Sequence, residues 1–363
     1  MKRTNANLFK LVIPAIVIAL YAFTLYRTAV DSLESEPARK VVLPPVSFDG
    51  SIPTDLTIEN MHMEEYAQFL PLDDPQLIPA SRATWLKPEA MILGVEQNNA
   101  AAAFPVFQMA YHHIANIVIG GTPYLVTYCV VCSSAVGFDP VVDGVRYTFE
   151  AFGLYHGMLV MRDRQSGELW TNYDGRVMTG DSRQMKVLPL IQMTWSEWQT
   201  LHPDTQVLDW YSEFARDYRN IISGNSDWNQ IEPDPSLVQD KRLTDQEMVL
   251  GISLQGNWRA YVLSDFGKSI TVLNDQLGGV PVLIVIDNTI GYAAAFHADY
   301  ENQVLEFSLD GDQIQDRSGT HWNLAGKAVD GPLLGGHLVF VQSFITEWYG
   351  WSSIHPETSI YGR

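Results

Sequence analysis

The chain has 363 residues, of which 46% are hydrophobic and 18% are charged. It is therefore long enough for two domains, and its composition is that of a globular protein rather than a disordered one. With 42 acidic and 23 basic side chains, its formal net charge is -19. That charge argues against nucleic-acid binding, which needs clustered Lys and Arg, and against attachment of the main body to anionic lipid.

An apolar run from Leu11 to Tyr26 is the clearest targeting signal. Counted from Leu8 it has about 19 residues, or roughly 28 Å as a helix, which is close to the thickness of a hydrocarbon core. Basic residues precede the run and acidic residues follow it. We therefore expect a cytoplasmic N-terminus and a periplasmic body at a bacterial inner membrane. No convincing small-x-small cleavage site follows, which favours a retained single-pass signal anchor. The anchor side chains are Leu11, Ile13, Ile16, Ile18, Leu20 and Phe23.

Composition divides the chain into five segments. Residues 1–29 form the cytoplasmic tip and the anchor, and residues 30–69, where Pro, Ser, Asp and Glu are frequent, are predicted to form an extracytoplasmic stalk. A first repeat follows in residues 70–211, a polar linker in residues 212–247, and a second repeat in residues 248–363.

Most elements predicted within the repeats are strands. Residues 123–131 form a buried strand that carries the first cysteine, and Pro105 suits the first turn of a helix over residues 105–117. Asp143-Gly144 is a hairpin signal between strands at residues 136–138 and 145–149. The other predicted elements are a hairpin of residues 159–161 and 169–171, a helix over residues 194–201 capped by Thr194, and a buried strand over residues 281–286.

The second repeat is a degenerate copy of the first. Gly120-Gly121-Thr122-Pro123 recurs as Gly278-Gly279-Val280-Pro281. The longer match joins Trp195-x-x-Trp198-x-x-x-His202-Pro203-Asp204-Thr205 to Trp348-x-x-Trp351-x-x-x-His355-Pro356-Glu357-Thr358. Self-similarity at this period predicts an α+β, predominantly β fold. We expect two tandem β-rich repeats with a pseudo-twofold relation, preceded by one N-terminal transmembrane helix. Residues kept in both copies are assigned to the scaffold, among them the turn pairs Asp163-Arg164 and Asp316-Arg317, which we predict to be salt bridges.

Cys129 and Cys132 are the only cysteines, and the second repeat has Asp287 and Ile290 in their places. Three interpretations remain open. A disulfide would close so short a loop that it stabilises by only about 2 kcal/mol. A redox-active pair has this spacing, but the intervening Val130 and Val131 offer no charge to stabilise a thiolate. A Cu or Zn site needs at least one further ligand, which histidine would have to supply.

Three histidines are confined to the first repeat. His112 and His113 lie on the predicted helix before the cysteine strand, and His156 lies in a loop-like stretch. Neighbouring helix positions point about 100° apart, so only one of His112 and His113 could face a given site. The structural alternative for each is a histidine bonded to backbone or water. The candidate metal ligands are Cys129, Cys132, His112, His113 and His156, and no residue is assigned a catalytic role.

From Thr127 to Ala135 the chain reads Thr-Tyr-Cys-Val-Val-Cys-Ser-Ser-Ala. This stretch resembles the T-Y-C-P-L-C-G-T-A core of an uncharacterised family of bacterial and archaeal domain-of-unknown-function proteins. Further similarities in the first repeat are Asp73-Asp74-Pro75, Tyr111-His112 with Asn116, Gly120-Gly121-x-Pro123, Leu159-Val160-Met161-x-Asp163-Arg164 and Trp198 to Thr205, and the overall likeness includes both repeats. Val130-Val131 replaces Pro-Leu, Ser133 replaces Gly, and His113 stands where the family has Glu. The resemblance implies an extracytoplasmic protein and no particular activity.

Two functions remain open. The anchor, the stalk, the acidic body and the absence of nucleotide-binding, metalloprotease and hydrolase motifs favour a non-catalytic accessory or scaffold subunit of a larger membrane complex, such as a respiratory or photosynthetic one. Its partners would be the other subunits and, through the N-terminal helix, the bilayer. The alternative is a redox-active dithiol or a Cu- or Zn-binding protein that uses Cys129 and Cys132.

Overall fold

The computed structural model describes residues 69–155, 157–179, 182–224 and 240–363. All of them belong to the second of the two units into which the chain divides, Val46–Arg363. The predicted anchor, including Leu11 and Phe23, and nearly all of the predicted stalk lie outside the described residues. Among the helices that the structure describes, none combines the length and the hydropathy that a membrane span needs.

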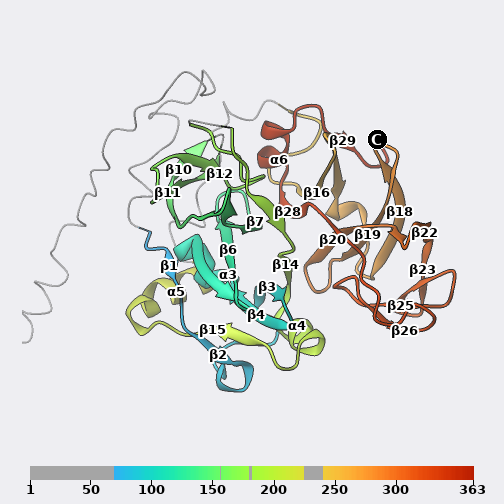
Figure 1. Cartoon of the computed structure of the whole chain (residues 1–363), viewed down its shortest axis with the longest axis horizontal. Helices are drawn as coiled ribbons and strands as arrows, with labels where there is room; N and C mark the ends of the chain where they lie inside the picture. Colours follow the sequence, from blue (N-terminus) through green and yellow to red (C-terminus); the bar gives the residue numbers. More distant parts are fainter. Residues whose placement is uncertain (1–68, 156, 180–181, 225–239) are drawn as a thin grey trace, which may run out of the picture. The chain divides into compact units, whose positions relative to one another are not determined.

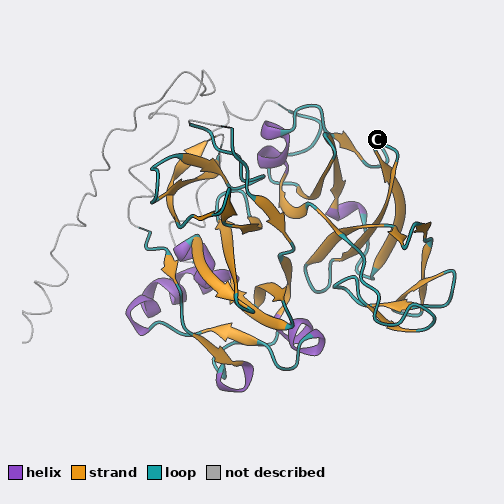
Figure 2. Ribbon diagram, in the orientation of Figure 1, coloured by secondary structure: helices purple, strands orange, loops and turns teal. Residues whose placement is uncertain are grey.

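Strands dominate both parts of the body, and the helices are short (Figure 2). We call residues 69–224 the first half and residues 240–363 the second half. The prediction of a β-rich fold with several sheets is thereby confirmed.

The described residues of the first half form three larger sheets and one small hairpin (Figure 1). One sheet has the order β14 (Ile191–Thr194), β3 (Met91–Gln97), β4 (Ala100–Pro105), β15 (Gln206–Leu208) and β2 (Leu77–Pro79). Another has the order β1 (Leu72–Asp73), β5 (Ile114–Ile119), β6 (Thr122–Cys129), β7 (Ser134–Asp139) and β13 (Lys186–Leu188). The third has the order β10 (Phe149–Tyr155), β11 (Met158–Asp163) and β12 (Leu169–Thr171), and β8 (Val141–Val142) pairs with β9 (Val145–Arg146). The helical segments are η2 (Ala80–Arg82), α3 (Val106–His112), α4 (Trp195–Leu201), η3 (Ser212–Phe214) and α5 (Ala215–Ile222).

The described second half has a similar set of sheets. One has the order β28 (Ser343–Glu347), β16 (Met248–Leu254), β17 (Asn257–Val262) and β29 (Ser359–Ile360). The next has the order β18 (Thr271–Leu277), β19 (Val280–Asp287), β20 (Tyr292–His297) and β27 (Phe340–Val341). A third sheet has the order β23 (Phe307–Asp310), β24 (Gln313–Asp316), β25 (His321–Trp322) and β26 (Ala328–Asp330). A two-stranded sheet pairs β21 (Asp299–Tyr300) with β22 (Gln303–Val304). The helical segments are η5 (Leu263–Asp265) and α6 (Trp348–Ile354).

The sheets β14-β3-β4-β15 and β28-β16-β17-β29 have the same connections. In each, the two central strands form an antiparallel hairpin, and the last strand joins it in parallel. In each, a helix with two tryptophans follows the first strand. A Cβ atom on Gly94 would lie under 3.0 Å from the Trp198 ring, and one on Gly251 would meet Trp351 in the same way. These glycines are therefore required by close packing of an indole on the sheet.

The same tryptophans are fixed by hydrogen bonds. Trp198 Nε1 donates to Thr205 Oγ1 at 2.9 Å, and Trp351 Nε1 donates to Thr358 Oγ1 at 2.9 Å. Both indoles are fully buried. The recurring Trp and Thr positions thus belong to the core of the scaffold.

The helix predicted over residues 105–117 ends early. α3 stops at His112, and His113 takes a positive φ of 60°. The residues after it continue as β5, because Ile114, Ile117 and Val118 are β-branched and suit an extended strand. The prediction of one continuous helix was wrong for residues 113–117.

One predicted hairpin differs, and another is confirmed. The Asp143-Gly144 turn joins the short strands β8 and β9, whereas β7 pairs with β6 and β13. β11 and β12 do form the predicted hairpin, with Met161 opposite Trp170. α4 also forms as predicted, although Thr194 makes no side-chain cap on it.

The segment predicted as a polar linker is partly structured. η3 and α5 occupy its first part, and the Tyr218 side chain of α5 is fully buried. The two halves also share one apolar cluster, which contains Cys132 and Trp170 of the first half and Trp348 and Tyr349 of the second. Each half also has an apolar cluster of its own, and in the shared cluster residues from both halves reach the cysteines.

Candidate functional site: a buried dithiol

Cys129 is the last residue of β6, and Cys132 lies in the turn that leads to β7. Ser133 closes this turn with a positive φ of 53°, so that Ser134 pairs with Cys129 across the hairpin. Both cysteines are free thiols and both are buried. The turn thus brings the two sulfurs within hydrogen-bonding reach of each other.

The surroundings of Cys129 favour a thiolate. Burial alone would raise the pKa of its thiol, but the Cys132 thiol and the backbone N–H groups of Cys132, Leu159 and Val131 outweigh burial and lower it. Hydrogen bonds to a charged form stabilise that form. The sequence could not reveal this, since the donors are main-chain groups and one of them belongs to β11.

Cys132 has the opposite character. Burial and the hydrogen bond to Cys129 raise the pKa of the Cys132 thiol well above its usual value. Its sulfur lies 3.1 Å from Ser134 Oγ, which also accepts from Asn172 Nδ2 at 3.2 Å. The pair therefore consists of a thiolate-prone sulfur and a neighbour that holds its proton.

The second half closes the site from one side. The backbone N–H of Glu347 donates to the Cys132 carbonyl at 3.0 Å, and Thr346 Oγ1 donates to the same carbonyl at 2.8 Å. Ser133 Oγ donates to Glu347 Oε1 at 3.3 Å. Burial raises the pKa of the Glu347 carboxyl to about 7. Sequence analysis did not single out Glu347, although it differs from Thr194 at the equivalent place before the Trp helix.

Tyrosines surround the sulfurs as well. Tyr349 Oη donates to the Gly157 carbonyl at 3.2 Å, between β10 and β11. A Cβ atom on Gly350 would lie 2.7 Å from Tyr173 Oη and 3.1 Å from Cys132 Cβ. Burial raises the pKa of Tyr128, Tyr173 and Tyr349, so all three hydroxyls are protonated at neutral pH.

The histidines occupy other places. His112 Nδ1 donates to the Leu70 carbonyl at 2.6 Å, and Nε2 accepts from the Tyr218 hydroxyl at 2.6 Å. His113 Nδ1 donates to the Tyr128 carbonyl at 2.9 Å. Burial lowers the pKa of both imidazoles to about 4, so both are neutral at pH 7.

His156 lies outside the described residues. Within the ranges that the structure describes, no three His, Cys, Asp or Glu side chains come together in a way that could hold a metal ion. The structure thus brings Cys129 and Cys132 together without His112, and a Cu or Zn site stays a prediction.

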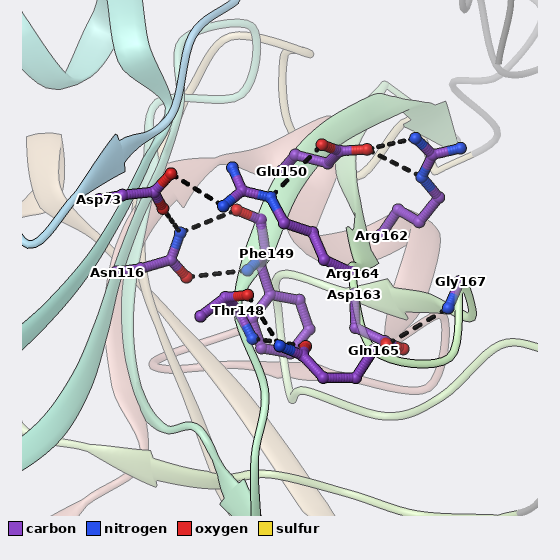
Figure 3. A network of polar contacts seen from close by, with 10 residues as sticks. All are labelled: Asp73, Asn116, Thr148, Phe149, Glu150, Arg162, Asp163, Arg164, Gln165 and Gly167. Atoms are coloured by element: carbon purple, nitrogen blue, oxygen red, sulfur yellow. Dashed lines mark hydrogen bonds and ion pairs between the residues drawn. The ribbon is translucent and has the colours of Figure 1, made fainter.

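A polar network attaches the β10-β11 hairpin to the sheet beside it (Figure 3). Asn116 donates to Asp73 Oδ1 at 2.9 Å, and it both donates to and accepts from the backbone of Phe149, at 2.9 and 2.8 Å. Arg164 Nη1 donates to Asp73 Oδ2 at 2.8 Å, and Arg162 pairs with Glu150. Because β11 supplies the Leu159 N–H group that bonds the Cys129 sulfur, this network fixes part of the thiol site.

The network corrects one prediction about the turns. Asp163 does not pair with Arg164; its carboxylate accepts from Ser166 Oγ at 2.7 Å and from Trp170 Nε1 at 2.9 Å. Asp316 accepts from Ser318 Oγ at 2.6 Å and from Trp322 Nε1 at 3.0 Å. The recurring aspartates are therefore turn acceptors that fix a tryptophan.

A cavity of about 460 Å³ lies near the cysteine strand. Its walls are mostly apolar and include Trp85, Phe107, Trp210, Tyr128 and Val130. Neither cysteine lines it, because Tyr128 and Cys129 alternate across β6 and belong to different apolar clusters. The cavity therefore does not give a ligand access to the sulfurs.

A family model described as "Protein of unknown function (DUF3179)" matches residues 69–358. The chain belongs to this family, which confirms the resemblance to an uncharacterised domain family. No curated protein and no solved structure matches the chain.

Proposed function

We propose that the protein is a thiol-based redox protein in which Cys129 and Cys132 cycle between a dithiol and a disulfide. The observation that carries the proposal is the set of donors around the Cys129 sulfur, three backbone N–H groups and the Cys132 thiol. A thiolate is the form that attacks an oxidant, and a neighbouring thiol is placed to resolve the product.

Burial limits the oxidant to a small molecule. Cys129 is 2% exposed and Cys132 is 0% exposed, so the disulfide of a partner protein would not reach either sulfur. A peroxide fits this restriction. The Cys129 thiolate attacks one peroxide oxygen, the O–O bond breaks, and hydroxide leaves, which oxidises the sulfur to a sulfenic acid.

The second step forms the disulfide. The Cys132 thiol gives up its proton as its sulfur attacks the Cys129 sulfur, and the displaced hydroxyl group leaves as hydroxide, which a proton from solvent converts to water. The pair has then lost two electrons to the peroxide, and a small-molecule dithiol reductant returns it to the starting state.

The test is peroxide treatment of the full chain in mild detergent, followed by peptide mass spectrometry. We expect one disulfide between Cys129 and Cys132 that dithiothreitol reverses. Cys132→Ser should stop at a sulfenic acid that dimedone traps, and Cys129→Ser should not react. Thiols that react only after unfolding would refute the proposal.

We also propose that the two halves arose by duplication and pack about a pseudo-twofold. The shared strand orders support this, and so do reciprocal contacts: Glu347 N donates to the Cys132 carbonyl, and Thr194 N donates to the Ile290 carbonyl, both at 3.0 Å. β28 lies beside β7, and β14 lies beside β20 (Figure 1).

A shared asparagine clamp is further support. Asn274 donates to the Phe307 carbonyl and accepts from the Phe307 N–H, both at 2.8 Å, as Asn116 does with Phe149. Each asparagine lies four residues before a Gly-Gly-x-Pro turn. A mutation in one clamp is expected to destabilise the chain about as much as the same mutation in the other.

For the whole chain we propose an accessory role at a membrane. The apolar run at Leu11–Tyr26 and the acidic body support a signal anchor that holds the body outside the cytoplasm. Val304, Leu334 and Val339 are 63–67% exposed on the second half and offer apolar contacts to another subunit. Gentle solubilisation of native membranes followed by size separation tests this, and migration as a free monomer would contradict it.

A further inference from the structure

The oxidation of the pair leaves one proton to be placed. The surroundings favour a thiolate at Cys129 and hold the proton on Cys132, which is fully buried. The groups around Cys132 are mostly hydroxyls, from Ser134, Thr346 and Tyr173. A neutral hydroxyl is a weak base, so the site needs a stronger proton acceptor.

We propose that Glu347, which comes from the half without cysteines, accepts the proton that Cys132 releases when the disulfide closes. This inference rests on the redox function proposed above. Glu347 is fixed beside the cysteine turn by its own backbone, because its N–H group bonds the Cys132 carbonyl at 3.0 Å. Its Oε1 accepts from Ser133, the residue that follows Cys132, at 3.3 Å.

Two hydroxyl groups, those of Ser133 and Tyr128, accompany this carboxylate at the cysteine turn. The Tyr128 hydroxyl is hydrogen-bonded to Ser133 and senses the charges of Cys129, Cys132 and Glu347, all of which raise its pKa in addition to burial. Ser133 in turn donates to Glu347. Glu347 is only partly buried, so it can pass a proton on to solvent.

The surroundings of the Glu347 carboxyl bring its pKa close to neutral pH. Burial raises its pKa to about 7, and the Ser133 hydrogen bond opposes part of that rise. The ideal general base has a pKa near the working pH. The titratable groups that interact with it are Tyr128 of β6 and Tyr349 of α6, which are protonated at neutral pH, and both of these also interact with Cys129 and Cys132.

The first half provides an internal control. At the equivalent contact, Thr194 N bonds the carbonyl of Ile290; Thr194 stands in the place of Glu347, and Asp287 and Ile290 stand in the places of the two cysteines. Thr194→Val changes a side chain at this place and leaves both the thiol pair and the backbone contact in position.

The experiment follows the rate of disulfide closure in the full chain after peroxide addition between pH 5 and 9. The wild-type rate should rise with pH through an inflection near pH 7. Glu347→Gln should lose that inflection and close the disulfide about 100-fold more slowly at pH 8, the lower end of what a positioned base supplies. Glu347→Asp should restore part of the rate, and Thr194→Val should match the wild type.

A second variant covers the case in which Glu347→Gln does not fold. Ser133→Ala removes the hydrogen bond that lowers the Glu347 pKa, so the inflection should move to higher pH. An unchanged profile in Glu347→Gln, or in Ser133→Ala if only that variant folds, would overturn the role of Glu347 and leave the redox function standing. A wild-type pair that does not form a disulfide would refute the redox function itself.

Discussion

Replacement of Gly94 by alanine tests how the scaffold is packed. The new methyl group would lie under 3.0 Å from three atoms of the Trp198 outer ring, Cζ3, Cε3 and Cη2. The indole cannot move aside easily, because it is fully buried and its Nε1 bonds Thr205 at 2.9 Å. Overpacking of this kind costs about 1–3 kcal/mol, against a gain of about 0.4–1 kcal/mol from the stiffer unfolded chain. We expect Gly94→Ala to lower the free energy of unfolding by about 2 kcal/mol.

A double-mutant cycle with Trp198→Phe separates this clash from other effects. Phenylalanine lacks the outer ring that the methyl group would strike. Trp198→Phe therefore leaves a buried cavity and removes the hydrogen bond to Thr205, but it makes room for a methyl group at residue 94. The double variant should therefore be more stable than the sum of the single losses predicts, by about 1–2 kcal/mol. Urea unfolding of the full chain in detergent measures each value.

The same cycle at Gly251 and Trp351 is the matched comparison in the second half. Its methyl group would meet the Trp351 ring in the same way, and Trp351 bonds Thr358 as Trp198 bonds Thr205. Coupling of the same sign in both halves is expected. Additive effects in either half would refute the packing argument for that half.

Four further predictions concern stability. Burial lowers the pKa of His112, His113 and His355 to about 4, so the unfolded chain binds more protons than the folded chain between pH 6.5 and 4. The stability that these neutral histidines contribute is complete above pH 6.5, and the free energy of unfolding should fall by up to roughly 3 kcal/mol per residue as the pH drops toward 4. Urea unfolding midpoints at pH 7 and pH 4 measure this loss. Glu347 acts in the opposite direction, because its raised pKa gives stability below pH 4.5 that is lost as pH rises through 7, and Glu347→Gln should steepen the acid loss. Asn116→Ala leaves the buried Phe149 N–H without its acceptor and should cost about 3 kcal/mol in urea unfolding, with Asn274→Ala as the comparison. Tyr218→Phe removes the hydroxyl that bonds His112 and should cost about 1 kcal/mol in the same assay, and no loss would contradict the bond.

The repeated anchors of the scaffold could be found from the sequence because they are local and spaced alike. Gly94 and Trp198 recur as Gly251 and Trp351, and their contacts are the same in both halves. The asparagine clamp had the same kind of signal, since Asn116 and Asn274 stand at one distance from a Gly-Gly-x-Pro turn. It was missed because a lone asparagine in a strand gives no hint that it bonds a backbone 33 residues away.

The end of α3 could not be predicted from periodicity. Ile114 and Ile117 fit one face of a helix, and the same β-branched residues also suit a strand. The choice depends on the positive φ of His113, which its ring bond to the Tyr128 carbonyl and the pairing of β5 with β6 hold in place. These are tertiary contacts, and a local pattern does not contain them.

At the thiol site, too, the sequence reveals the local pattern but not the contacts made by distant residues. The spacing of Cys129 and Cys132 identified the pair, but the absence of charged residues between them argued against a thiolate. The structure supplies the missing stabilisation through main-chain N–H groups, among them that of Leu159, and through the turn geometry. Side-chain chemistry alone therefore missed the donors on which the redox proposal rests.

The retention of a half without cysteines follows from the contacts at this site. Thr346 and Glu347 bond the Cys132 carbonyl, and Gly350 packs against Cys132 so closely that a side chain there would reach Tyr173. Loss of the second half would expose the cysteine turn and remove the carboxylate beside it. Under the proposed duplication, the first copy kept the thiols and the second copy acquired the proton acceptor, because each copy presents the start of a Trp helix to the other's turn. Thr194 at the reciprocal contact faces no thiol, so under these proposals an acid is needed at only one of the two equivalent positions.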